Sequence, residues 1–177
     1  MATAQEATRP IFKLSLGAVF AALVCIVTVL FTIPIPATSG YFNLGESIIF
    51  IAALTFGPLV GSIAGGGAAI ADLILGFYVF APGTLAIKAF EGMVVGIINT
   101  RLKRRTSSAS LSAMVSIAIG GSGMVIGYFV YEKLILGYPT ALALGEVPFN
   151  IFQVVIGLLV AVPIMHAIFR VFPHLKS

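Results

Sequence analysis

Three charged residues, Asp72, Lys88 and Glu91, lie inside the apolar stretch 58–98. A charge within a transmembrane helix costs about 2.5–3.5 kcal/mol on insertion scales, so such residues usually face a polar cavity or a protein interior and mark function. Lys88 and Glu91 are three residues apart, which places them on one helical face where they can pair. Asp72 precedes a short break at 81–83 by about as far as Glu91 follows it. We therefore expect the three charges to meet at a similar depth.

The composition places these charges in an integral membrane protein. The chain has 177 residues, of which 59% are hydrophobic and 9% are charged, and its mean hydropathy is +1.13. A soluble domain carries about 25% charged residues. We expect a single domain over 1–177. One cysteine, Cys25, excludes an intrachain disulfide. The net charge of +4 does not indicate nucleic-acid binding, because the basic residues cluster at the expected membrane edges.

The apolar runs predict an all-α fold, a compact bundle of six transmembrane helices. A span needs about 20 apolar residues, and Pro34 and Pro36 end the first run. A signal peptide with small residues at 37–40 is the alternative for this run, but its apolar core exceeds the usual length of about 7–15 residues. Pro148 falls in the first turn of the last helix, and Pro163 could kink it. The predicted spans are 11–33, 43–56, 58–77, 84–102, 110–133 and 146–169.

Six spans place both termini on one side of the membrane. Basic residues then gather on that side: Arg9, Lys13, the cluster 101–105, Arg170 and Lys176. Cytoplasmic loops carry an excess of lysine and arginine, so we expect both termini in the cytoplasm. The loops 34–42, 79–83 and 134–145 would then lie outside.

With this topology, nearly every strongly polar residue within a span lies in its outer half, and the inner halves consist of small and aliphatic residues. Glu146, Asn150 and Gln153 follow one another at helical spacing on one face. Uncharged amides within a span need partners, so this face is expected to line a cavity near the outer surface. Alternatives remain open. Lys88 and Glu91 could form a structural ion pair with Asp72 as a further partner of Lys88, and Glu46 could be a helix-start acid facing water.

The sequence offers no catalytic machinery. A P-loop motif and the H-E-x-x-H motif are both absent, and no histidine or cysteine set suits a metal. We therefore expect neither an enzyme nor a bound metal or cofactor.

Several segments together resemble the substrate-binding S component of an energy-coupling factor (ECF) vitamin transporter. The resemblance rests on the six short spans, on the proline-rich first external loop running into 40–46 (GYFNLGE), on Phe56-Gly57-Pro58 with Gly61, and on the helix from Lys88 to Gly96. It implies a subunit of the cell membrane that binds a small water-soluble vitamin or precursor near the outer face. The partners implied are a transmembrane coupling protein and two ABC-type ATPases, which would use the ATP.

The resemblance also implies a site, with the first external loop as its lid. Substrate-binding positions would be Tyr41, Asn43, Lys88, Glu91, Tyr128, Tyr131, Asn150 and Gln153, with Glu46, Asp72 and Glu146 in supporting positions. Charges, amides and tyrosines suit a small polar aromatic ring, so pyridoxine or hydroxymethylpyrimidine is the first expectation. Riboflavin, biotin and thiamine remain open, although the absence of tryptophan favours a small ligand.

Ala18 and Ala22 match an A-x-x-x-A pattern that in this family forms the docking face for the coupling protein. Small side chains let two helices approach closely. Packing of these alanines inside the bundle is the alternative.

Two other functions are consistent with the residues alone. A stand-alone secondary transporter driven by protons or cations would use Asp72, Lys88 and Glu91 as a relay. No inverted repeat or pair of broken helices supports it. A scaffold without any ligand is the third possibility.

Overall fold

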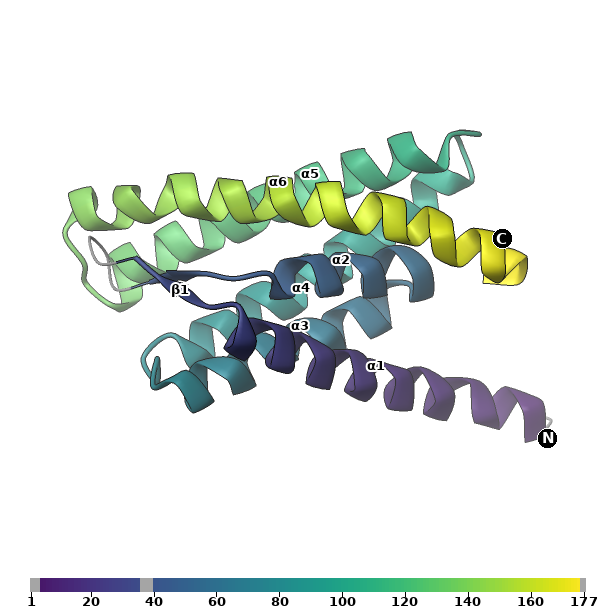
Figure 1. Ribbon diagram of the computed structural model, residues 1–177, viewed down its shortest axis with the longest axis horizontal. Helices are drawn as coiled ribbons and strands as arrows, with labels where there is room; N and C mark the ends of the chain where they lie inside the picture. Colours follow the sequence, from purple (N-terminus) through teal and green to yellow (C-terminus); the bar gives the residue numbers. More distant parts are fainter. Residues whose placement is uncertain (1–3, 36–39, 176–177) are drawn as a thin grey trace.

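The computed structural model describes residues 4–35 and 40–175, with side chains described from Pro10 onward. Six long or medium helices run roughly along one axis, and both ends of the chain lie at the same end of the bundle (Figure 1). The helices are α1 (Ala4–Leu30), α2 (Gly45–Phe56), α3 (Pro58–Leu75), α4 (Ala81–Lys103), α5 (Ala109–Val130) and α6 (Thr140–Val171).

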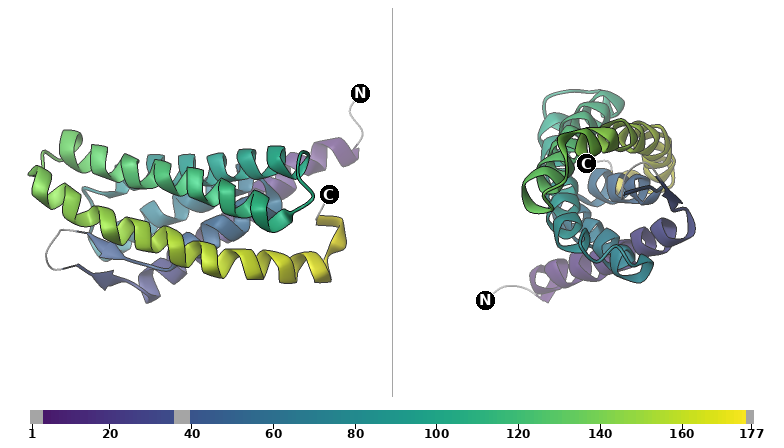
Figure 2. Two further views of the ribbon diagram at one scale, coloured as in Figure 1. Left: turned by 90° about the horizontal axis from the view of Figure 1, so that it is seen from above. Right: turned by 90° about the vertical axis from the view of Figure 1, so that its left-hand side faces the viewer.

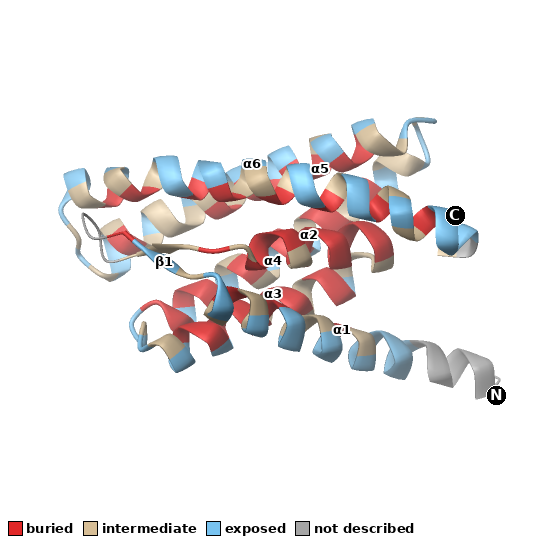
Figure 3. Ribbon diagram, in the orientation of Figure 1, coloured by how far each residue is buried: buried red, intermediate tan, exposed pale blue. Residues whose placement is uncertain are grey.

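Five of these helices are long and apolar enough to cross a membrane, counted over the described residues, and α2 is a shorter apolar helix. Figure 3 shows α2 almost entirely buried, whereas the outward faces of the other helices are exposed. These outward faces are apolar, with side chains such as Ile11, Leu134 and Leu159 more than 60% exposed. Apolar outer surfaces suit a lipid environment. The predicted all-α membrane bundle is therefore confirmed, with α2 as its central helix.

Two hydrophobic clusters hold α2 in place. One joins it to α4, α5 and α6 through Phe50, Val95, Ile117 and Met165. The other joins it to α1 and α3 and includes Val24, Ile49 and Val60. Viewed end on, the long helices surround α2 (Figure 2).

Gly57, Gly61 and Gly65 recur at every fourth residue, and Gly92 is followed by Gly96 at the same spacing, a pattern that predicts close helix packing. In the structure Gly61, Gly65, Gly92 and Gly96 bring α3 and α4 into close contact. A Cβ atom at Gly65 would overlap the backbone carbonyl of Lys88, and one at Gly92 would overlap the carbonyl of Gly61. Small residues allow this backbone approach. The contact fixes the depth of Lys88 relative to α3.

The first connection contains a small hairpin that the sequence did not predict. Strands β1 (Ile33–Pro34) and β2 (Tyr41–Phe42) pair antiparallel, with Ile33 opposite Phe42 and Pro34 opposite Tyr41. Helix α1 ends at Leu30, three residues before the predicted boundary. Pro36 and the small residues at 37–39 that the signal-peptide alternative requires lie outside the described residues.

The predicted break at 81–83 is wrong, because α4 already begins at Ala81. Pro82 occupies the first turn of a helix, where a missing N–H costs nothing. The real break is 76–80, which starts at Gly76 with a left-handed φ of 87°. Helix α3 therefore ends at Leu75, two residues before the predicted end.

The last two helices also differ from the prediction. Helix α5 passes into a π-helical turn, η1 (Tyr131–Ile135), and α6 begins at Thr140 instead of 146. Pro139 precedes α6 in an extended conformation, and it fixes the start of the helix. Pro148 therefore lies in the helix interior and not in the first turn, and α6 continues through Pro163. A short 3-10 helix, η2 (Pro173–Leu175), follows.

Candidate functional site

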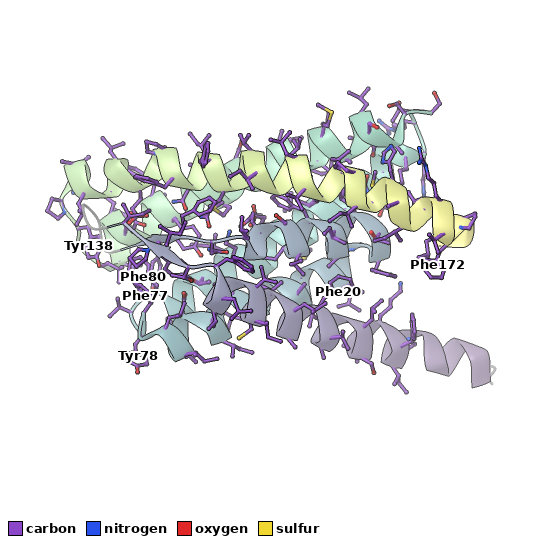
Figure 4. The ribbon with its side chains drawn as sticks, viewed as in Figure 1. Phe20, Phe77, Tyr78, Phe80, Tyr138 and Phe172 are labelled. Atoms are coloured by element: carbon purple, nitrogen blue, oxygen red, sulfur yellow. The ribbon has the colours of Figure 1, made fainter. Side chains whose placement is uncertain are left out.

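The polar residues converge on a cavity at the end of the bundle that holds the β1–β2 hairpin. Phe77, Phe80 and Tyr138 lie at this end (Figure 4), with Phe80 in edge-on contact with both other rings. The cavity has a volume of about 40 Å³. Its walls come from the hairpin and from α3, α4, α5, η1 and α6: Gly40, Tyr41, Asn43, Ala68, Asp72, Phe80, Thr84, Lys88, Tyr128, Glu132, Glu146, Asn150 and Gln153.

A buried ion-pair cluster forms the floor of the cavity. The Nζ atom of Lys88 donates to Glu46 on α2 and lies 3.4 Å from Oε2 of Glu91, one turn further along α4. All three residues are at most 3% exposed. The predicted Lys88–Glu91 pair is confirmed. The water-facing alternative for Glu46 is wrong, since this residue is the hydrogen-bonded partner of Lys88.

A chain of amide side chains forms the wall between the hairpin and α6. Oε1 of Gln153 accepts from the backbone N–H of Asn43 at 3.0 Å and from its Nδ2 at 2.7 Å. Nε2 of Gln153 donates to Oδ1 of Asn150 at 3.2 Å. Oδ1 of Asn43 accepts from the N–H of Gly45 at 2.9 Å. These bonds tie the start of α2 to α6, so the hairpin and the cavity wall are one connected network.

Two tyrosines, Tyr41 of β2 and Tyr128 of α5, line the cavity. The Tyr41 hydroxyl donates to Asp72, and the Tyr128 hydroxyl donates to Thr84 at 3.1 Å. Burial and the neighbouring carboxyl group of Asp72 raise the pKa of Tyr41 above its ordinary value, so this hydroxyl remains a donor. The Tyr128 ring also faces Nζ of Lys88, 5.6 Å from the ring centroid. Asp72 thus pairs with the hairpin and does not complete the Lys88 cluster directly.

Two further carboxyl groups line the cavity. Glu132 in η1 and Glu146 in α6 are 1% and 5% exposed. A Cβ atom at Gly40 would overlap the Glu146 carboxyl group, so a larger residue at this position would require that side chain to shift. Glu46, Asp72 and Glu91 are buried as well, so five of the six acidic residues of the chain are buried in or next to this cavity.

The site therefore has many more carboxyl and amide hydrogen-bond acceptors than basic side chains. Of the described residues that line the cavity, Lys88 is the one that is basic. Among the described residues, no three acidic, histidine or cysteine side chains are arranged to hold a metal ion. The arrangement can instead bind a ligand rich in N–H and O–H donors, because carboxyl and amide oxygens accept hydrogen bonds.

The structure brings most of the predicted site residues together. Glu91 and Glu46 lie beneath the cavity, where they hold Lys88. Tyr131 does not line the cavity, because its hydroxyl donates to the backbone carbonyl of Val79 at 2.7 Å. The predicted residues that line it are Tyr41, Asn43, Asp72, Lys88, Tyr128, Glu146, Asn150 and Gln153.

Sequence reasoning missed Phe80, Thr84 and Glu132 as lining residues. Glu132 follows Tyr128 by four residues, and this spacing on one helical face was a usable signal. Phe80 and Thr84 were obscured by the wrongly placed break at 81–83.

The half of the bundle away from the polar cavity contains more polar groups than the sequence predicted. Asn99 donates to the carbonyl of Leu54 at 3.0 Å, and the Ser112 hydroxyl donates to Oδ1 of Asn99 at 2.9 Å. Ser116 donates to the carbonyl of Ser112 at 2.6 Å. These buried groups satisfy one another and do not line the polar cavity.

The outer face of α1 is exposed. Ala18 and Ala22 are exposed and line an apolar groove of about 810 Å³ against α3, with Ile63, Gly66 and Ile70 on the opposite side. The contact with α3 is made instead by Ala21, whose carbonyl lies against Gly67. Packing of Ala18 and Ala22 inside the bundle is therefore wrong.

Comparisons with known proteins agree with this architecture. The family model described as ECF-type riboflavin transporter, S component, matches residues 10–170. The thiamine precursor transporter HmpT of Lactococcus lactis subsp. cremoris is 34% identical over 155 residues, covering 86% of this chain and 85% of that protein. An uncharacterized protein of Pyrococcus woesei is 39% identical over 138 residues, covering 77% of this chain and 88% of its own length.

A solved structure shares the fold. It is described as the S component of a bacterial ECF transporter, and it matches with a TM-score of 0.72 over 95% of this chain and 99% of that one, at 18% identity. The secondary-transporter alternative is not favoured by these findings. The chain belongs to the family of ECF-type riboflavin transporter S components and is thus a multi-pass membrane protein that binds substrate for vitamin uptake, not an enzyme.

Proposed function

We propose that this chain binds a single-ring aminopyrimidine, such as the thiamine precursor hydroxymethylpyrimidine, in the polar cavity. The observation that carries the proposal is the convergence of Asp72, Glu132 and Glu146 with two amide side chains, Asn150 and Gln153, on one enclosed space. Carboxylates accept hydrogen bonds, and amides both donate and accept. An aminopyrimidine offers N–H donors and ring-nitrogen acceptors in one plane, so it matches both groups.

The size of the cavity also favours a small ligand. A volume of about 40 Å³ has room for about three water molecules, because each needs about 10–15 Å³ of such space. Any ring must therefore displace side chains or the hairpin, and a one-ring ligand requires the smaller displacement. The printed name of the L. lactis relative, thiamine precursor transporter, supports this choice. The name of the family model refers to riboflavin, whose three fused rings require a larger opening.

Pyridoxine is the second candidate ligand, because it is also a small polar ring. It carries hydroxyl groups in place of the amino group. Recognition of the amino group therefore distinguishes the two candidate ligands. A ligand without this group would leave a buried carboxyl group without a hydrogen-bond donor.

Calorimetric titration of the purified full chain tests the proposal. We expect hydroxymethylpyrimidine to bind with 1:1 stoichiometry, and the analogue with hydrogen in place of the amino group to bind at least about tenfold more weakly, which is about 1.4 kcal/mol. Equal affinity for the two compounds would exclude recognition through the amino group. Tighter binding of pyridoxine or riboflavin would reassign the substrate.

We also propose that the cavity end faces outward and that both termini are cytoplasmic. Basic residues support this orientation. Lys13 lies near the start of α1, residues 101–105 include the end of α4, and Arg170 lies in the last turn of α6. These helix ends lie at the same end of the bundle as the termini (Figure 1), and such an excess of basic residues marks the cytoplasmic side. A cysteine introduced at exposed Ser107, in a Cys25→Ser background, should react with an impermeant maleimide only after cells are opened. Labelling of intact cells would reverse the orientation.

The family implies a coupling protein and ATPases as partners. We propose that a separate transmembrane coupling protein docks on the groove beside Ala18 and Ala22, and that two ABC-type ATPases consume the ATP. The exposed alanines support this position, because small side chains leave room for a close helix contact.

A further inference from the structure

A second cavity lies at the opposite end of the bundle from the polar cavity, among the ends of α1, α2, α3 and α4. Its volume is about 480 Å³. Three cations line it from two helices: Lys13 on α1, and Lys103 and Arg104 at the end of α4. None of the described residues that line this cavity is acidic. Among the side chains that the structure describes, Lys88 at the other end is the one that forms ion pairs, so no described acidic group neutralises these three cations.

Lys103 is held at the cavity by neutral partners. Its Nζ lies 4.3 Å from the centroid of the Phe169 ring and 3.5 Å from the backbone carbonyl of Leu54. A lysine ammonium has three donors, so these contacts position the charge and leave donors for an anion. Pro58 also lines the cavity at the start of α3, where a helix carries partial positive charge and unpaired N–H groups.

A buried polar group without a partner gives independent support. Thr55 lines the same cavity and is 8% exposed, yet its Oγ1 has no hydrogen-bond partner within the part of the chain that the structure describes. A buried hydroxyl normally has a partner, and an unsatisfied one requires an explanation such as an ion or ligand. An oxyanion at this position would accept the missing hydrogen bond.

The surroundings favour a lipid as the source of this anion. Ile11 and Phe12, which directly precede Lys13, are more than 60% exposed, and Leu175 of η2 also lines the cavity. An anionic head beside exposed apolar side chains at the end of a membrane helix is the chemistry of a phospholipid, and basic pockets between transmembrane helices bind such head groups. We propose that this cavity binds the phosphate of an anionic phospholipid.

Native mass spectrometry of the purified full chain tests the proposal, with phosphatidylglycerol and phosphatidylcholine of identical acyl chains as probes. We expect phosphatidylglycerol to be retained preferentially. Lys103→Gln and Arg104→Gln should each lower that retention about fivefold, which is about 1 kcal/mol per basic side chain. Thr55→Val, which keeps the shape and removes the hydroxyl, should also lower it.

Matched variants distinguish this cavity from a diffuse positive surface. Arg105→Gln removes the same charge one residue away, outside the cavity, and should retain the lipid like the unaltered chain. Arg104→Lys keeps the charge and should retain it as well. Equal losses in Arg104→Gln and Arg105→Gln would overturn the proposal, as would equal retention of the two lipids.

Two further measurements identify the source of the anion. Displacement of phosphatidylglycerol by millimolar inorganic phosphate would assign the phosphate site to a free anion, whereas resistance to displacement would assign it to the lipid. Variants that lose assembly with the coupling protein, while the two lipids are retained equally, would overturn lipid binding and assign this surface to a protein contact. None of these outcomes depends on which vitamin the polar cavity binds.

Discussion

Lys88 is the residue on which the polar site depends, because it is a buried cation between two buried carboxylates. Its pairing with Glu91 was predictable from the three-residue spacing on one helix. Its bond to Glu46 was not, because 42 residues separate the two in sequence and only the packing of α2 against α4 brings them together. Tertiary contacts of this kind leave no local pattern in a sequence.

Breaking this cluster should destabilise the fold. We expect Lys88→Met to lower the free energy of unfolding by about 3–5 kcal/mol, because removing one partner leaves buried charge without compensation. The Lys88→Met/Glu46→Gln double variant should recover part of the loss. Thermal unfolding in detergent measures the stability of the single and the double variant. A double variant no more stable than the single one would argue against the pairing.

Asn150 should act on the ligand and not chiefly on the fold. We expect Asn150→Ala to weaken hydroxymethylpyrimidine binding about tenfold or more, or about 1.4 kcal/mol, because its amide lines the cavity. Asn99→Ala is the control, since Asn99 is equally buried but bonds Leu54 and Ser112 at the other end. Titration calorimetry compares the two variants. Equal affinity in both would remove Asn150 from the site.

Among the elements, the α3–α4 pair positions the floor of the cavity. Its glycine spacing predicted close packing from sequence, and the backbone contacts confirm it. The hairpin, the start of α6 at Thr140 and the π-helical turn after α5 were not predictable in the same way. Each depends on where prolines fall relative to helix ends and on contacts with distant segments, so hydrophobic periodicity alone does not place them.

A pair of adjacent glycines tests the α3–α4 contact. We expect Gly65→Ala to lower the thermal midpoint and weaken ligand binding, because its Cβ would meet the backbone of Lys88. Overpacking of this kind costs about 1–3 kcal/mol. Gly66→Ala meets only Leu85 at 3.5 Å, an ordinary contact, and should be neutral or slightly stabilising. Indistinguishable midpoints for the two variants would contradict the contact.

The outer face of α1 should matter for uptake and not for binding. We expect Ala18→Leu and Ala22→Leu to reduce substrate uptake by cells that express all the subunits, because larger side chains would block a close helix contact. Binding to the purified chain should remain unchanged. Ala118→Leu, on the exposed face of α5, is the matched control. Full uptake and normal co-purification with the coupling protein in the α1 variants would exclude this docking face.

At the scale of the whole molecule, polar chemistry divides between the two ends of one apolar bundle. Carboxyl groups and amides collect around the cavity under the hairpin, and basic side chains collect at the end with the termini, where no ion pair is found among the described residues. Composition and the spacing of apolar runs were enough to predict the helices and the end at which the polar residues gather. The contacts of Glu46 with Lys88 and of Asn43 with Gln153 were not predictable in this way, because only the packing of α2, and of the segment directly before it, against α4 and α6 brings these distant residues together.

The central claim is that this chain alone holds a single-ring vitamin precursor in the polar cavity. Its most direct test is mass spectrometry of the purified chain after incubation with an equimolar mixture of hydroxymethylpyrimidine, pyridoxine, thiamine and riboflavin. We predict that one molecule of hydroxymethylpyrimidine is retained per chain, and that Asn150→Ala retains less of it. Retention of riboflavin, or of no compound from the mixture, would contradict the claim.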